Sequence, residues 1–158
     1  PATQMGPMVH TRRRDAIEAL VQDATAKGAR LLAGGERVGN EGAFYAPTVL
    51  ADVPDHARIM HEEPFGPVAV LNPFGDLEDG IAKANSLPYG LAAYAFTSSA
   101  SNINRLGDAI EAGMVGINSF NISTPETPFG GVKDSGHGSE VGIEGIEAFL
   151  VTKTLSIT

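Results

Sequence analysis

Two carboxylates, an aromatic ring and two prolines occupy residues 62–67, which read Glu-Glu-Pro-Phe-Gly-Pro. Because proline fixes φ at about −65° and lacks a backbone donor, Pro64 and Pro67 predict a stiff turn that leads into a strand. A carboxylate held beside a flat ring could bind a ligand with hydroxyl groups and a planar base. An ordinary surface turn has the same composition, and the residue types alone favour that interpretation.

A Gly-rich stretch at residues 130–142 also attracts attention, because such loops can hold phosphates. Its final glycines, Gly136, Gly138 and Gly142, have one residue too many between them for G-x-G-x-x-G, and no G-K-[ST] motif follows. Lone glycine motifs are weak signals. We therefore predict a structural turn here.

Metal and thiol chemistry find little support. The four histidines form neither an H-x-x-x-H nor an H-E-x-x-H pair, so no metal site is predicted; they are His10, His56, His61 and His137. The chain has no cysteine, which excludes disulfides, thiolate ligands and a cysteine nucleophile supplied by these residues. Three consecutive arginines at residues 12–14 are interpreted as a solvated or ion-paired helix surface.

Composition excludes several other classes of protein. A length of 158 residues suits one domain. The net charge of −8 disfavours nucleic acid as a partner. No apolar run approaches the roughly 20 residues of a membrane helix, and no signal peptide is recognisable, so a cytoplasmic location is expected. Because the chain starts with proline, either a methionine was removed or an upstream segment is missing.

The elements expected to position these residues alternate through the middle of the chain. Strands are predicted at 68–71, 91–97 and 114–117, with helices near 77–84 and 103–110. The apolar run at 91–97 suits a strand that is covered on both faces. Such alternation indicates βαβ units, and hence an α/β fold with a mainly parallel sheet and flanking helices.

The two ends of the chain add a helix and a strand. Apolar side chains at helical spacing predict an amphipathic helix; they are Ile17, Leu20, Val21 and Ala24. Thr11 is the expected N-cap of this helix, and Gly28 its stop signal. Residues 151–158 alternate β-branched and polar side chains and are predicted to form a strand.

Two of these segments carry a family resemblance. Residues 62–68 resemble the E-E-x-F-G-P-V motif of the aldehyde dehydrogenase superfamily, and residues 128–136 resemble its P-F-G-G-x-K-x-S-G motif. Supporting segments lie in the same order along the chain, at residues 6–8, 28–35, 47–50, 89–91, 111–115 and 151–154. The resemblance covers essentially the whole sequence.

The resemblance implies that the chain is the C-terminal third of such an enzyme. Residues 1–150 would form the C-terminal portion of the catalytic domain, and residues 151–158 a strand through which a homo-oligomer assembles. The family's dinucleotide-binding domain, catalytic cysteine, general-base glutamate and oxyanion-hole asparagine would lie upstream. No catalytic residue is therefore expected in this chain, which alone should be inactive.

The resemblance also implies binding residues. In the family, a cysteine thiolate attacks an aldehyde and hydride passes to NAD or NADP. Glu63 matches the glutamate that binds the nicotinamide-ribose hydroxyls, and Phe65 the aromatic residue beside the nicotinamide. Phe129 matches an aromatic residue of the substrate tunnel. The choice between NAD and NADP stays open, because the discriminating residues would lie upstream.

The loop at residues 118–124 resembles that of succinate-semialdehyde dehydrogenases. Ser123 matches the serine that binds the substrate carboxylate, although a plain loop serine is the alternative. Residues 138–140 read Gly-Ser-Glu instead of the commoner G-R-E, which removes a cation. Two further alternatives are a parent enzyme acting on another aldehyde and a noncatalytic module that self-associates through its terminal strand.

Overall fold

The long N-terminal helix is present in the computed structural model, which describes residues 4–158, as α1, Thr11–Ala26. Its N-cap is His10, whose Nδ1 accepts a hydrogen bond of 3.0 Å from the backbone N–H of Arg13. The prediction of Thr11 as the cap was wrong, because a ring nitrogen can replace a hydroxyl as acceptor and His10 is the last extended residue. Gly28 has a φ of 106°, which suits glycine and ends the helix as predicted.

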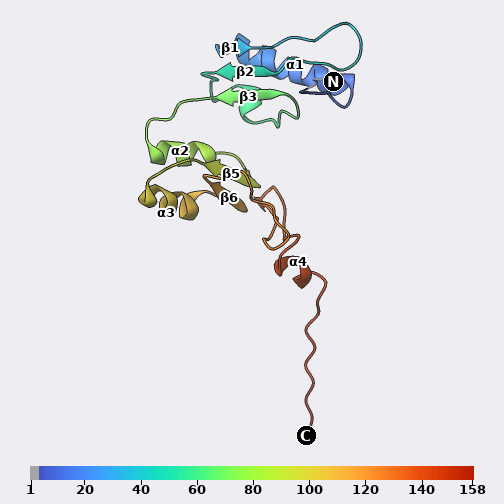
Figure 1. Ribbon diagram of the computed structural model, residues 1–158, viewed down its shortest axis with the longest axis vertical. Helices are drawn as coiled ribbons and strands as arrows, with labels where there is room; N and C mark the ends of the chain where they lie inside the picture. The colour runs from blue at the N-terminus through green and yellow to red at the C-terminus, as the bar shows by residue number, and fades with distance from the viewer. Residues whose placement is uncertain (1–3) are drawn as a thin grey trace. The chain divides into compact units, whose positions relative to one another are not determined.

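The first compact unit, residues 1–73, places α1 against a three-stranded sheet (Figure 1). Its strands are β1 (Arg30–Ala33), β2 (Thr48–Ala51) and β3 (Val68–Leu71). The central strand β2 runs antiparallel to β1 and parallel to β3. The register places Thr48 opposite Val68, directly after the proline-rich turn.

The core of this unit forms where the apolar stripe of α1 meets the sheet. Ile17 and Leu50 are fully buried. The 3₁₀ helix η1 (Arg58–Met60) adds Ile59 to the same cluster. The predicted helical stripe is confirmed, since all of its members are buried: Ile17, Leu20, Val21 and Ala24.

The second compact unit comprises residues 74–158. Its helices are α2 (Leu77–Ala84), α3 (Ala100–Ala109) and the short α4 (Glu144–Glu147). Its strands are β4 (Tyr89–Gly90), β5 (Ala92–Ala95), β6 (Met114–Ile117) and β7 (Val132–Lys133). β5 and β6 are parallel, and β4 pairs antiparallel with β7.

The fold is α/β, as predicted, and the alternation of strands and helices from 68 to 117 is confirmed. The strands of this stretch belong to different sheets, because β3 pairs with β2 whereas β5 pairs with β6. Alternation alone does not tell which strands pair. The prediction that the 91–97 strand is covered on both faces was wrong, since exposed and half-buried residues alternate along β5. The described chain covers only one of its faces.

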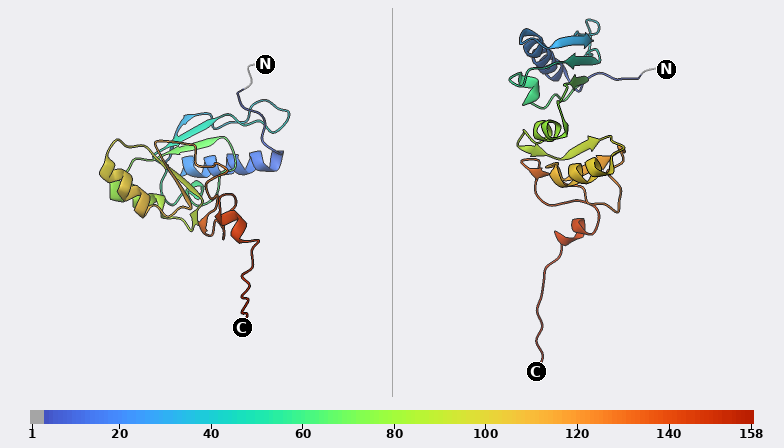
Figure 2. Two further views of the ribbon diagram at one scale, coloured as in Figure 1. Left: turned by 60° about the horizontal axis from the view of Figure 1, so that its bottom comes forward. Right: turned by 90° about the vertical axis from the view of Figure 1, so that its left-hand side faces the viewer.

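The C-terminal segment, residues 151–158, has no secondary structure and extends beyond α4 (Figures 1 and 2). Val151 is 93% exposed and Ile157 84% exposed. A strand needs a neighbour that accepts and donates its backbone hydrogen bonds, and no segment within residues 4–158 pairs with this one. The predicted strand is therefore not formed within the chain, and its role in oligomers stays a prediction. None of the helices formed by the described residues has the length and apolarity needed to cross a membrane.

Leu50→Ala should lower the free energy of unfolding by about 2–5 kcal/mol, because the cavity would open in a fully buried site. Leu32→Ala on β1 is the matched control; Leu32 is 51% exposed, and the expected cost is below about 1 kcal/mol. Urea unfolding followed by circular dichroism measures both. Equal losses would contradict this placement of the core.

Candidate functional site

The motif at residues 62–67 folds into two successive tight turns. The backbone N–H of Phe65 donates to the carbonyl of Glu63 at 3.0 Å, and that of Val68 donates to the carbonyl of Gly66 at 2.9 Å. Each bond spans two residues and so closes a γ-turn, centred on Pro64 and Pro67 in turn. The fixed φ of proline suits this conformation. The predicted stiff turn that enters a strand is confirmed.

The two adjacent glutamates of the motif have different surroundings. The carboxylate of Glu62 accepts two hydrogen bonds from the guanidinium of Arg58, at 2.7 and 2.9 Å. These hydrogen bonds, with the positive charge of Arg58, lower the pKa of Glu62. The side chain of Glu63 is exposed and forms no hydrogen bond or ion pair with any residue in the described range 4–158. Only Glu63 therefore has its full acceptor capacity available for a ligand.

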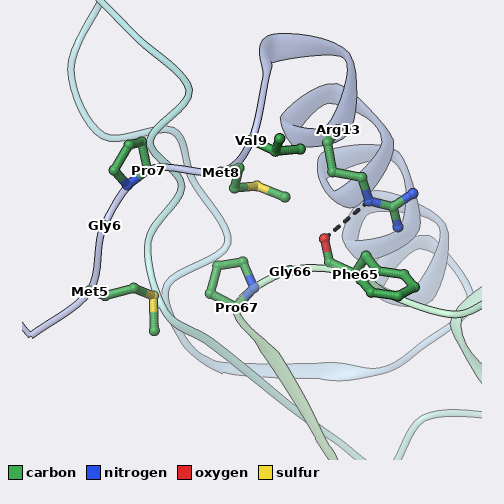
Figure 3. Close-up of a pocket in the computed structure, with 9 residues that line it drawn as sticks. All are labelled: Met5, Gly6, Pro7, Met8, Val9, Arg13, Phe65, Gly66 and Pro67. Carbon is green, nitrogen blue, oxygen red and sulfur yellow. Dashed lines mark hydrogen bonds between the residues drawn. The ribbon is translucent and has the colours of Figure 1, made fainter.

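Phe65 follows Glu63 by two residues on this turn, and its ring is 66% exposed. It borders an open pocket of about 570 Å³, which residues 5–9, Arg13 and residues 65–67 line (Figure 3). The guanidinium carbon of Arg13 lies 5.8 Å from the centroid of the ring, within cation–π range. The turn thus carries an exposed carboxylate at Glu63 and an exposed aromatic ring at Phe65.

Arg13 holds the turn to α1. Its Nε donates to the carbonyl of Phe65 at 3.0 Å (Figure 3). Its Nη2 donates to the carbonyl of Glu63, also at 3.0 Å. The sequence interpretation of the arginines as a solvated or ion-paired surface missed this role. A signal was present, because Arg13 precedes the buried Ile17 by four residues and so lies on the same helix face. Arg12 lies off that face and is exposed.

Ser123 belongs to the loop that follows β6 in the second unit. It is exposed, and within residues 4–158 its hydroxyl has no hydrogen-bond partner. Asn118 fixes the start of the loop, since its side chain accepts from the N–H of Thr97 and donates to the carbonyl of Thr97, both at 2.8 Å. The loop is therefore anchored while the Ser123 hydroxyl stays available.

Phe129 lies at the far end of the same loop and is half-buried. Its N–H donates to the carbonyl of Glu140 at 2.8 Å, and its carbonyl accepts from the N–H of Glu140 at 2.7 Å. This bridge fixes the backbone that carries the ring. The structure thus places Ser123 and Phe129 in one segment of the second unit, and Glu63 and Phe65 on one turn of the first.

The Gly-rich stretch packs backbone against backbone. A Cβ on Gly113 would lie 1.9 Å from the carbonyl oxygen of Gly130. A larger residue at Gly113 would therefore prevent the close contact between its backbone and that of Gly130. Lys133 donates to the carbonyls of Asn85 and Leu87, at 3.1 Å each. The predicted structural turn is confirmed. Among residues 4–158, no three or more acidic or histidine side chains gather in a group that could hold a metal ion.

Comparisons with known proteins agree with the motifs. The family model described as "Aldehyde dehydrogenase family" matches residues 1–155. The 4-(hydroxymethyl)benzenesulfonate dehydrogenase TsaD1 of Comamonas testosteroni is 53% identical over 151 residues, which are 96% of this chain and 31% of that protein. A succinate-semialdehyde dehydrogenase of Paenarthrobacter nicotinovorans is 46% identical over 157 residues, 99% of this chain and 35% of that protein.

A solved structure extends the comparison. The succinate-semialdehyde dehydrogenase from Burkholderia pseudomallei matches with a TM-score of 0.90 at 40% sequence identity, over 94% of this chain and 31% of that chain. The chain therefore spans about a third of the length of the curated relatives it matches.

The pairing of Glu62 with Arg58 makes the stability of the chain depend on pH. Pairing with Arg58 lowers the pKa of Glu62 below its ordinary value of 4.5, so this stability is present above that pH and is lost as the pH falls through the lowered pKa. Between about pH 6 and pH 3, Glu62→Gln should therefore lose less unfolding free energy than the wild type. Arg58→Gln removes the cation that lowers this pKa and is the matched control, so it should reduce the acid-induced loss in the same way. Urea titrations across this range measure both, and a wild-type profile in either variant would contradict the assignment.

Proposed function

The chain belongs to the aldehyde dehydrogenase family, and on this premise we propose that it is the C-terminal part of an NAD(P)-dependent aldehyde dehydrogenase. Residues 1–150 are assigned to the catalytic domain, and residues 151–158 to an oligomerisation strand that joins copies of the enzyme. The isolated chain has no cysteine and is expected to be inactive. A cytoplasmic location stays a prediction.

The observation that carries the proposal is the unpartnered carboxylate of Glu63 on a rigid turn. A carboxylate accepts hydrogen bonds only, so it suits the paired hydroxyls of a ribose. Its neighbour Glu62 is held by Arg58 and is not available in the same way. The exposed ring of Phe65 offers an apolar face to a planar base. These residue types and their placement fit the nicotinamide end of NAD(P).

NAD(P) supplies the acceptor for the hydride that leaves the substrate. The contribution of this chain is to hold and orient. Glu63 binds the ribose hydroxyls, and Phe65 packs beside the nicotinamide. Together they restrict the orientations that the nicotinamide ring can adopt. Such orientation lowers the entropic part of the barrier to transfer. Phe129 is assigned to the wall of the substrate tunnel.

Succinate semialdehyde is the proposed substrate, with Ser123 donating a hydrogen bond to its carboxylate. The exposed, unpartnered hydroxyl on an anchored loop supports this role. The 53% identity to a 4-(hydroxymethyl)benzenesulfonate dehydrogenase favours an aromatic sulfonate as the second candidate. Both candidates carry an anionic group that a hydroxyl can bind, so an anionic substrate is common to the two proposals.

In the complete dehydrogenase, Glu63→Gln should raise the KM for NAD(P)⁺ by roughly tenfold, because an amide replaces half of the acceptor capacity with donors. Glu62→Gln is the matched control and should leave this KM within about twofold, a change well below 1.4 kcal/mol. Steady-state kinetics with succinate semialdehyde measure both. The noncatalytic alternative predicts no effect of Glu63→Gln, together with loss of self-association when residues 151–158 are deleted.

Ser123→Ala should raise the KM for succinate semialdehyde by roughly fivefold or more, because the carboxylate loses a hydrogen-bond donor. Butanal has the same chain length without the carboxylate, and its KM should not change. Assays with 4-formylbenzenesulfonate, the aldehyde that corresponds to 4-(hydroxymethyl)benzenesulfonate, distinguish the second candidate. An equal change for the acid and for butanal would contradict the role of Ser123 as an anion-binding residue.

A further inference from the structure

We propose that Arg13 is a positioning residue for the cofactor site, which it serves by holding the turn that carries Glu63 and Phe65. The inference rests on the proposed function, since it concerns the same site. Arg13 itself is not assigned any contact with cofactor or substrate. Its role is to fix the backbone from which both binding side chains project.

The contact between Arg13 and the turn involves two backbone carbonyls on either side of Pro64. One planar guanidinium donates from Nε to Phe65 and from Nη2 to Glu63, at 3.0 Å in both cases. A rigid fork of this kind restrains the direction of both carbonyls at once, which a single donor cannot do. Hydrogen bonds from a charged donor are also stronger than those between neutral groups.

Backbone hydrogen bonds tie the two ends of the segment to the unit: the N–H of Glu62 donates to the carbonyl of Arg58 and the N–H of Thr48 donates to the carbonyl of Pro67, both at 2.8 Å. Between these ends, at residues 63–66, the turn depends on other contacts. Pro64 and Pro67 carry no N–H, so these positions cannot donate hydrogen bonds to the sheet. The internal bonds of the γ-turns shape the segment but do not tie it to the rest of the unit. Within residues 4–158, no other side chain donates to the carbonyls of Glu63 or Phe65. Arg13 thus supplies the external hydrogen bonds that these carbonyls receive.

The base of Arg13 is itself well fixed. Its backbone N–H donates to Nδ1 of His10, and its half-buried side chain lies on the same helix face as the buried Ile17. Next to Phe65, a Cβ on Gly66 would lie 2.6 Å from the side chain of Ile17. The turn therefore rests directly on α1, with Arg13 holding it on one side of this contact. The guanidinium also restrains the Phe65 ring, 5.8 Å from its centroid.

The first test uses the 158-residue chain and does not depend on enzymatic activity. Endoproteinase Glu-C cleaves after glutamate, and its rate at Glu62 reports how firmly the turn is held. Arg13→Ala should speed this cleavage roughly tenfold relative to cleavage after Glu126, since the bonds to two carbonyls are lost. Arg12→Ala removes the same charge from the exposed neighbour and should leave the ratio unchanged. If Arg13→Ala does not fold, Arg13→Lys should give a smaller increase, because lysine keeps the positive charge but lacks the planar fork that fits both carbonyls.

The second test uses the complete dehydrogenase. Arg13→Ala should raise the KM for NAD(P)⁺ roughly tenfold and leave the KM for the aldehyde unchanged. Arg13→Lys should raise the KM for NAD(P)⁺ by less, and Arg12→Ala should leave it unchanged. If Glu63→Gln raises this KM and Arg13→Ala does not, the inference is overturned while the proposed function stands. If neither variant raises it, the cofactor role of Glu63 fails. If Arg13→Ala raises the KM for NAD(P)⁺ and the KM for the aldehyde equally and also lowers the Tm, Arg13 has a structural role only, and the inference is overturned as well.

Discussion

The candidate cofactor site depends on the contact between helix α1 and the proline-rich turn fifty residues further along the chain. The apolar stripe of α1 packs on the sheet. Arg13 lies on the same helix face, one turn before Ile17, and donates hydrogen bonds to the turn. Gly66 permits the close approach, because any side chain there would collide with Ile17. The packing that stabilises the first unit therefore also sets the position of the turn.

Within that turn, the adjacent residues Glu62 and Glu63 have identical side chains but different surroundings. The carboxylate of Glu62 forms a bidentate pair with Arg58 on the adjoining 3₁₀ helix, whereas the carboxylate of Glu63 has no partner among the described residues. Exposed ion pairs contribute little to stability. For the proposed function, the pair with Arg58 occupies the Glu62 carboxylate, so that Glu63 is the glutamate of this turn whose carboxylate is available to a ligand.

Much of the local structure could be predicted from the sequence, because the signals were local. β3 and β6 have the predicted bounds. The motifs identified the turn before its geometry was known. The cap at His10 was missed because ring nitrogens are uncommon acceptors at that position. The role of Arg13 was missed because its partners are backbone carbonyls distant in sequence; its spacing to Ile17 indicates the helix face on which it lies but not what packs against that face.

The remaining differences arise where the chain provides no partner of its own. Exposed and half-buried residues alternate along β5, and residues 151–158 form no strand within the described chain. Both segments have strand-like composition, but burial and pairing need neighbours. Sequence patterns report the propensity of a segment, whereas the packing surface comes from whatever lies against it.

The most direct test of this account is a crystal structure of the complete dehydrogenase with NAD(P)⁺ bound. The account predicts a carboxylate oxygen of Glu63 about 2.6–3.2 Å from a nicotinamide-ribose hydroxyl. Glu62 should remain paired with Arg58, and Arg13 should keep its bonds to the carbonyls of Glu63 and Phe65. A structure in which Glu63 turns away from the ribose, or in which Glu62 makes that contact instead, would contradict it.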